Sequence, residues 1–98
     1  MIKVEVSIND NDVALAGELT QRTITQALEK KSIQFFKNKS VNVDLAGVQK
    51  VDMAGLAWLL TLVELALRHA CAIKFINLST ELQNLAKLTS VDSFLPSQ

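Results

Sequence analysis

Residues 41–59 read VNVDLAGVQKVDMAGLAWL, and this stretch decides the fold. Its first five residues alternate between apolar and polar side chains, which predicts a short strand ending near the turn signal Ala46-Gly47. The apolar residues that follow recur at helical spacing, so a helix is predicted from near Asp52 to about Ala70. A strand followed closely by a helix is half of a strand-helix-strand unit.

The preceding sequence adds a hairpin and a helix. The alternation over residues 2–8 predicts a first strand, and the turn cluster at 9–12 leads into a second strand over 13–16, closed by Gly17. Apolar residues at helical spacing predict one amphipathic helix over 20–36. Lysines at its basic end are interpreted as solvated side chains that complement the helix dipole.

The sequence after the long helix completes the pattern. Residues 72–76 form an apolar run that predicts a fourth strand, and Ser79 is a suitable N-cap for a last helix with Glu81 in its first turn. The predicted order is ββαβαβα. This order implies an α/β fold, in which a mixed four-stranded sheet has its helices largely on one face. We expect residues 1–98 to form a single domain.

Composition narrows the possible functions. The chain has 98 residues, 49% hydrophobic, with ten basic and ten acidic side chains, so nothing in its charge favours nucleic acid or an anionic membrane surface. The N-terminus has no pattern of a secretory signal, and the most apolar segment, 53–67, is too short to span a membrane. The single cysteine, Cys71, fits a reducing compartment, so we expect a cytoplasmic protein.

The inventory of chemically active residues does not predict an enzyme. There is one histidine, His69, no tyrosine, and no glycine-rich loop for a dinucleotide or a triphosphate. His69 is interpreted as a surface or cap residue, Cys71 as a small buried hydrophobe, and Asp44 and Asp52 as a turn former and a helix cap. We therefore expect no catalytic residues, no metal and no cofactor.

The long helix is apolar over more of its circumference than one core contact needs. One stripe of seven residues is expected to face the sheet: Leu56, Leu59, Leu60, Val63, Ala66, Leu67 and Ala70. A second set, Trp58, Leu62 and Leu65, is expected on the side facing away from the sheet. Either neighbouring helices cover this second set, or it is a protein interface. The lone tryptophan favours an interface.

The stretch VDLAGVQKVDMAGL, residues 43–56, resembles the signature of the STAS domain, the module shared by sulfate transporters and anti-sigma-factor antagonists. Within that superfamily, LAGEL at 15–19, GLAWLL at 55–60 and LAKL at 85–88 are most similar to the small STAS subunit of Mla phospholipid ABC transporters. This resemblance implies a cytoplasmic, non-catalytic subunit, peripheral to the inner membrane through its partner. Such a subunit binds the transporter's ATPase, which works with a permease, and supports lipid asymmetry in the outer membrane.

One residue departs from the family pattern. The resemblance implies a phosphorylated serine after the helix-opening aspartate in antagonists, and a threonine in Mla-type subunits, whereas this chain has Met53. Because Met53 has no hydroxyl group, an anti-sigma-factor antagonist is the weaker alternative. Partner binding is predicted at the start of the helix and on its outer side, through Asp52, Met53, Ala54, Gly55, Trp58, Leu62 and Leu65.

Overall fold

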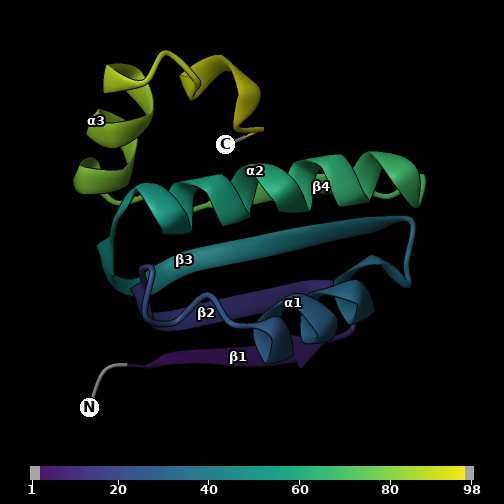
Figure 1. Ribbon diagram of the computed structural model, residues 1–98. Helices are drawn as coiled ribbons and strands as arrows, with labels where there is room; N and C mark the ends of the chain where they lie inside the picture. Colours follow the sequence, from purple (N-terminus) through teal and green to yellow (C-terminus); the bar gives the residue numbers. More distant parts are fainter. Residues whose placement is uncertain (1–2, 97–98) are drawn as a thin grey trace.

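The computed structural model describes residues 3–96, which form a four-stranded sheet with three α-helices and two short 3-10 helices (Figure 1). The sheet order is β1-β2-β3-β4, and the predicted order of elements, ββαβαβα, is confirmed. The elements in chain order are β1 (Val4–Asn9), β2 (Asp12–Leu19), α1 (Gln26–Ser32), η1 (Ile33–Phe36), β3 (Ser40–Val51), α2 (Met53–Arg68), β4 (Ala72–Ile76), α3 (Thr80–Leu88) and η2 (Asp92–Phe94).

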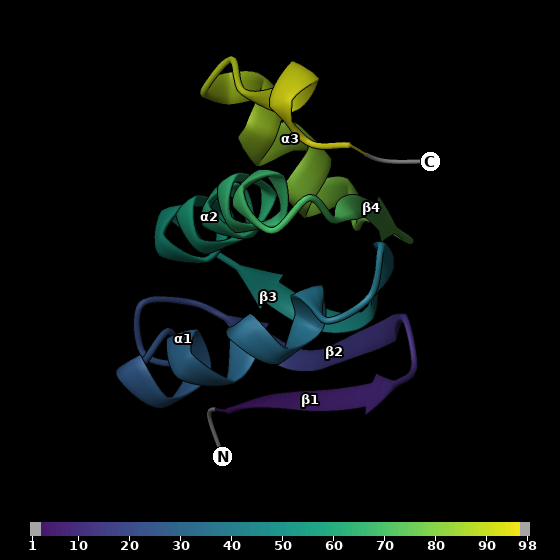
Figure 2. The same ribbon diagram turned by 90° about the vertical axis from the view of Figure 1, so that its right-hand side faces the viewer.

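The sheet is mixed, as predicted. Strands β1 and β2 form an antiparallel hairpin, whereas β2 pairs with β3 and β3 pairs with β4 in parallel. Along β3, Val41, Val43 and Leu45 are buried while Asn42 and Asp44 between them are only partly buried. Alternate residues of a strand point to opposite faces, so the helices cover one face of this sheet. Figures 1 and 2 show α1 and α2 lying over that face, with α3 beyond α2.

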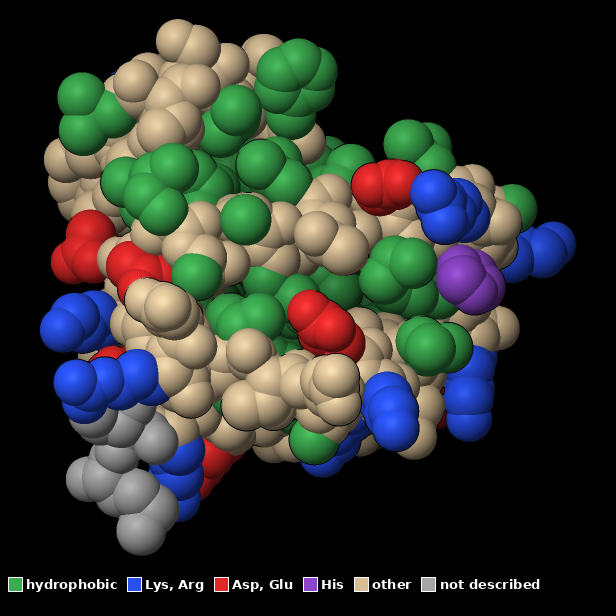
Figure 3. Space-filling view, in the orientation of Figure 1, with side chains coloured by type: hydrophobic (Ala, Val, Ile, Leu, Met, Phe, Trp, Pro, Cys, Tyr) green, Lys and Arg blue, Asp and Glu red, His purple; other side chains and the backbone are tan. Residues whose placement is uncertain are grey.

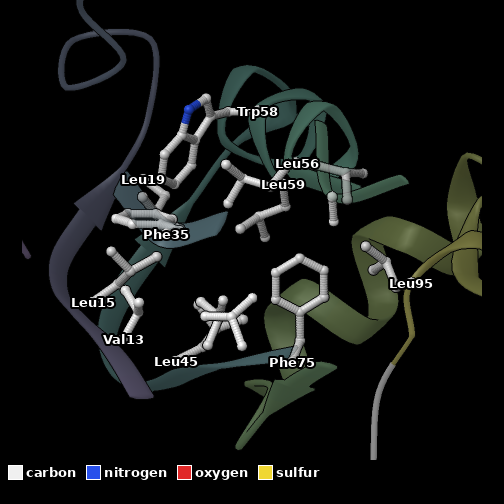
Figure 4. Close-up of a cluster of buried hydrophobic side chains, with 14 of the residues drawn as sticks. Val13, Leu15, Leu19, Phe35, Leu45, Leu56, Trp58, Leu59, Phe75 and Leu95 are labelled. Atoms are coloured by element: carbon white, nitrogen blue, oxygen red, sulfur yellow. The ribbon is translucent and has the colours of Figure 1, made fainter. Parts of the chain in front are cut away.

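The core lies between the covered face and the helices. Figure 4 shows side chains from the strands meeting those of α2, among them Leu15, Leu45, Leu59 and Phe75. The C-terminal segment closes one end, because Leu95 is buried and the carbonyl of Pro96 accepts a hydrogen bond from the amide of Phe75 at 2.8 Å. One contiguous apolar core is what a domain of this length can support.

Two strands run further than the turn signals indicated. β2 continues through Gly17, which has φ of +97° and lies at a shift in register against β3, so glycine marks a bulge there rather than the end of the strand. β3 likewise continues through Ala46-Gly47 to Val51. The alternation over residues 2–8 predicts that Ile2, Val4, Val6 and Ile8 share one buried face. Ile8 is nevertheless 39% exposed near the end of the hairpin, and Ile2 lies outside the described residues.

The predicted helix over 20–36 is much shorter in the structure. α1 begins after Thr25, whose hydroxyl accepts a hydrogen bond from the amide of Leu28, and ends at Ser32, where a 3-10 turn follows. The preceding loop is held by Thr23, whose hydroxyl accepts from the amide of Thr20 and donates to the carbonyl of Glu18. A threonine that bonds locally in this way competes with helix formation, which explains the late start.

The second half of the chain agrees closely with the sequence pattern. α2 begins after Asp52, β4 spans Ala72–Ile76 as predicted, and α3 begins after the predicted N-cap Ser79. None of the helices within residues 3–96 combines the length and hydropathy that crossing a bilayer requires. Within the same residues, no three His, Cys, Asp or Glu side chains come together as a metal site would need.

Gly55 lets α2 approach β2, and its replacement tests this contact. A Cβ at this position would lie within 3 Å of Leu19, closest to its backbone carbonyl oxygen. We expect Gly55→Ala to destabilise the domain by about 1–3 kcal/mol, because backbone atoms must move to admit the methyl group. Chemical denaturation measures the change. Ala57→Gly, at an exposed position on the same helix, is the control for helix propensity, and equal stabilities of Gly55→Ala and the wild type would contradict the predicted clash.

Candidate partner-docking surface

The start of α2 is held rigidly by Asp52, the predicted helix cap. Its carboxylate accepts hydrogen bonds from the amide of Gly55 in the first turn and from the amide of Gln21 in the β2–α1 loop, both at 3.0 Å. Its own amide donates to the carbonyl of Leu19 at 3.1 Å. Asp52 therefore joins the end of β2, the following loop and the helix at one point, which fixes how the residues after it are presented.

These hydrogen bonds set the charge state of Asp52. Desolvation opposes ionisation, but the amide groups of Gln21 and Gly55 favour the carboxylate and outweigh it, so the pKa of Asp52 lies below its ordinary value. The pKa of Asp44 is also lowered, because Asn77 and the amide of Ala46 donate hydrogen bonds to it. Asp52 is therefore ionised at neutral pH and stabilises the N-terminus of the helix as a charged cap.

A lowered folded pKa predicts how stability depends on pH. The contribution of Asp52 is fully present above the ordinary aspartate value of 3.8 and is lost as the pH falls through the lower, folded value. We expect Asp52→Asn, which still caps helices well, to reduce the slope of stability against pH in this acidic range. Urea unfolding at a series of pH values measures it, and Asp44→Asn, which removes the other carboxylate with a lowered pKa, is expected to reduce the slope in the same direction. An unchanged slope in Asp52→Asn would show that its carboxylate is not stabilised by folding.

Three of the predicted contact residues lie directly after this cap. Met53 is 53% exposed at the tip of the helix, Ala54 is partly buried, and Gly55 is buried against β2. Met53 and Ala54 are thus accessible to another protein. Gly55 packs closely against Leu19, so it contributes to the candidate surface only by setting the position of α2.

The prediction that Trp58, Leu62 and Leu65 lie on the side facing away from the sheet, free for a partner, is wrong, because all three pack against the core. Trp58 is 3% exposed and Leu62 is 0% exposed, while Leu65 is partly buried against the core. Figure 4 shows the indole of Trp58 pointing from α2 toward Leu19 of β2 and Phe35 of η1. In this fold Trp58 and Leu62 therefore belong to the core and cannot form a docking surface.

The 3-10 helix η1 covers Trp58, which explains why the prediction of an exposed tryptophan was wrong. η1 packs against α2 and brings the buried side chains of Phe35 and Phe36 to it. The sequence predicted one continuous helix here, with Phe35 on its apolar stripe, and did not place either aromatic ring against the long helix. Because α2 is apolar around most of its circumference, the pattern alone could not tell which of two adjacent stripes lies on the core.

The apolar residues that remain exposed lie on the other flank of the helix. Met53, Leu60 and Leu67 are seven residues apart, and seven residues turn a helix by 700°, so the three side chains fall almost in line. Leu67 is 77% exposed and Leu60 is partly buried. We call Met53, Leu60 and Leu67 the α2 seam. Sequence reasoning assigned both Leu60 and Leu67 to the core. This was wrong for Leu67, whereas Leu60 packs in part against the core.

The α2 seam continues into hollows beside the C-terminal segment. Two adjoining hollows, of about 310 and 410 Å³, share Val63, Leu67 and Phe94. Phe94 of η2 is 64% exposed. Figure 3 shows hydrophobic side chains gathered on this face of the molecule, over α2 and the elements above it. An exposed apolar surface of this kind is typical of a protein-binding site.

The other residues singled out from the sequence lie away from this surface or are buried. Cys71 is buried, and burial raises the pKa of its thiol, as expected for a small core residue. His69 is the C-cap residue of α2 and is exposed, in agreement with its interpretation as a surface or cap residue. Its ring stacks on Phe36, with ring centroids 5.7 Å apart. Within residues 3–96, Cys71, His69, Asp44 and Asp52 do not come together as a group that could hold a metal ion.

Comparison with known proteins gives a match along almost the whole chain. Residues 3–96 match the family model described as "Mlab, STAS domain". No curated protein matches the sequence.

Solved structures with the same fold include several anti-sigma-factor antagonists. The antagonist from Mycobacterium paratuberculosis has a TM-score of 0.73 at 21% identity, covering 96% of this chain and 82% of that one. The STAS-domain antagonist from Planctomyces limnophilus has a TM-score of 0.72 at 12% identity, with 97% and 88% covered. The phosphorylated Bacillus cell-fate determinant SpoIIAA has a TM-score of 0.66 at 13% identity, with 97% and 90% covered. At these identities the likeness shows the fold alone.

Proposed function

The chain belongs to the STAS domain family, and from this premise we propose that it is the small, non-catalytic STAS subunit of an Mla-type phospholipid ABC transporter. In this role it binds the ATPase subunit in the cytoplasm and supports assembly and activity of the complex with its permease. The description of the matching family model supports the Mla-type assignment. The observation that carries the binding function is the exposed α2 seam, which begins at Met53.

The start of α2 is suited to docking because it is both rigid and accessible. Asp52 is fixed by two backbone amides, so Met53 and Ala54 are presented in one position before a partner arrives. A preformed surface loses little conformational freedom on binding, which favours affinity. Small side chains at Ala54 and the exposed Ala57 allow a partner backbone to approach the helix closely.

The α2 seam fits a helix of the partner. Side chains seven residues apart form the seam of a helix pair, and here the seam is flanked by Ala57 and Glu64 on one side and by Val63 on the other. Full burial of a large apolar side chain contributes roughly 1.5–3 kcal/mol before the costs of association. Met53 and Leu67, both more than half exposed in the free domain, have the most to gain.

A regulatory role as an anti-sigma-factor antagonist is the second candidate, favoured by the fold likeness to solved antagonists. One of these relatives, SpoIIAA, is known in a phosphorylated form. Resemblance places the phosphoacceptor serine of antagonists at Met53, which cannot accept a phosphoryl group. A phosphorylation switch at this position is therefore absent, and the transporter role is the better proposal.

Copurification from the native cell separates the two roles. The tagged full-length chain is expected to retain an ABC ATPase together with its permease, identified by mass spectrometry. Recovery of a kinase-like anti-sigma factor in place of the ATPase would favour the antagonist. The matched control is the same chain with Leu67→Glu, which changes the α2 seam at an exposed position and is expected to lose the ATPase.

A further inference from the structure

The outer edge of β1 carries backbone N–H and C=O groups that do not pair with another strand within residues 3–96. β1 is an edge strand, and within residues 3–96 it pairs only with β2. The carbonyl of Lys3 accepts a hydrogen bond from the amide of Glu18, which fixes the phase of the ladder. Residues 3, 5 and 7 therefore direct their N–H and C=O groups toward β2, and the alternate residues, Val4, Val6 and Ile8, direct theirs outward.

A groove of about 350 Å³ lies beside this edge, where α1 and the loop before it face β1. Val4 and Val6, both partly buried, line it together with the buried side chain of Leu28. An extended segment placed along β1 would thus find both free backbone partners and an apolar surface for alternate side chains. These are the two requirements of recognition by strand addition.

The charges around the groove are all positive. Lys3, Arg22 and Lys31 line it, and no Asp or Glu is among its lining residues within the described part of the chain. Lys3 forms an ion pair with Glu5 at 2.8 Å, whereas Arg22 and Lys31 have no ion pair among residues 3–96. Charge complementarity therefore requires carboxylates in the segment that binds here.

From this we propose that the β1 edge binds an extended acidic segment of a partner protein as a fifth strand of the sheet. Its amides and carbonyls pair with Val4 and Val6, and its carboxylates face Arg22 and Lys31. A second copy of this chain fits less well, because β1 presents Val4 and Val6 on the groove side and Glu5 on the opposite face. This surface is separate from the α2 seam, since Figure 2 shows β2 and β3 lying between β1 and α2.

A displayed library of random twelve-residue peptides, selected on the full-length chain, tests the proposal. The enriched peptides are expected to carry both β-branched residues and Asp or Glu at positions two apart, so that both kinds of side chain lie on the strand face that meets the groove. Their affinities are then measured by fluorescence polarisation. Val6→Pro removes one outward N–H while keeping every bond between β1 and β2, and proline is tolerated on edge strands. We expect it to weaken binding by at least about tenfold, and Val6→Ala, the control for lost packing, by less than about threefold.

A second variant keeps the test decisive if Val6→Pro does not fold. Arg22→Glu with Lys31→Glu changes two exposed side chains and is expected to weaken binding at least about tenfold. Leu67→Glu changes the α2 seam and not the β1 groove, so it is expected to leave peptide binding unchanged. The test of the β1 edge is therefore independent of the test of the transporter role. The proposal is overturned by selection without enrichment, by binding that survives the charge reversal, or by a self-associated dimer that Val6→Pro dissociates.

Discussion

Trp58→Glu is expected to abolish cooperative folding of the isolated domain, and Trp58→Ala to lower its free energy of unfolding by about 3–5 kcal/mol. The indole is 3% exposed and points toward Leu19 and Phe35, so its removal leaves a cavity among core side chains. A glutamate at the same place would put an unpaired charge in that cavity. Because small domains have only about 5–15 kcal/mol of stability in total, the charged variant falls below the threshold for folding.

Two measurements check this result. Thermal unfolding followed by circular dichroism compares both Trp58 variants with Leu67→Ala, which removes a large side chain of the same helix from an exposed position. In the wild type, Trp58 is the only tryptophan, so its fluorescence reports the environment of one side chain. A well-folded Trp58→Glu domain, or wild-type emission typical of a water-exposed indole, would show that Trp58 is exposed and would contradict the described packing.

Loss of partner binding is the second large effect, and it is expected from Met53→Glu and from Leu67→Glu. Both side chains are more than half exposed in the free domain, so the substitutions cost little stability. In the complex each glutamate would be buried against apolar residues without a counterion. A buried contact of this kind costs about 2 kcal/mol or more when it is lost, which is at least about a thirtyfold drop in affinity.

The control for this prediction is Leu88→Glu. Leu88 is 83% exposed on α3, so it matches Leu67 in residue type and in accessibility but lies outside the α2 seam. Titration of each variant with the purified ATPase of the proposed transporter, by calorimetry, gives the affinities, and circular dichroism confirms that each variant is folded. Equal affinities for the wild type and Leu67→Glu would remove the α2 seam from the interface. Loss of binding in Leu88→Glu would extend the interface onto α3.

The candidate site was predicted from the sequence only in part. Asp52 was correctly identified as a helix cap, and the accessibility of Met53 follows from its place directly after that cap. The hydrogen bond from Gln21 to Asp52 could not be foreseen, because the two residues are 31 positions apart and their contact depends on the sheet register. The assignment of Trp58 failed for a similar reason, since its cover comes from η1.

The order of strands and helices, the mixed sheet and the caps at Asp52 and Ser79 were determined by the sequence by itself. These features depend on hydrophobic periodicity and on hydrogen bonds between residues close in the chain, which one sequence displays directly. Only the tertiary structure decided which side of α2 is covered. An almost wholly apolar helix can pack on several of its faces. Aromatic side chains from the distant segment η1 cover one of these faces and leave Met53 and Leu67 exposed.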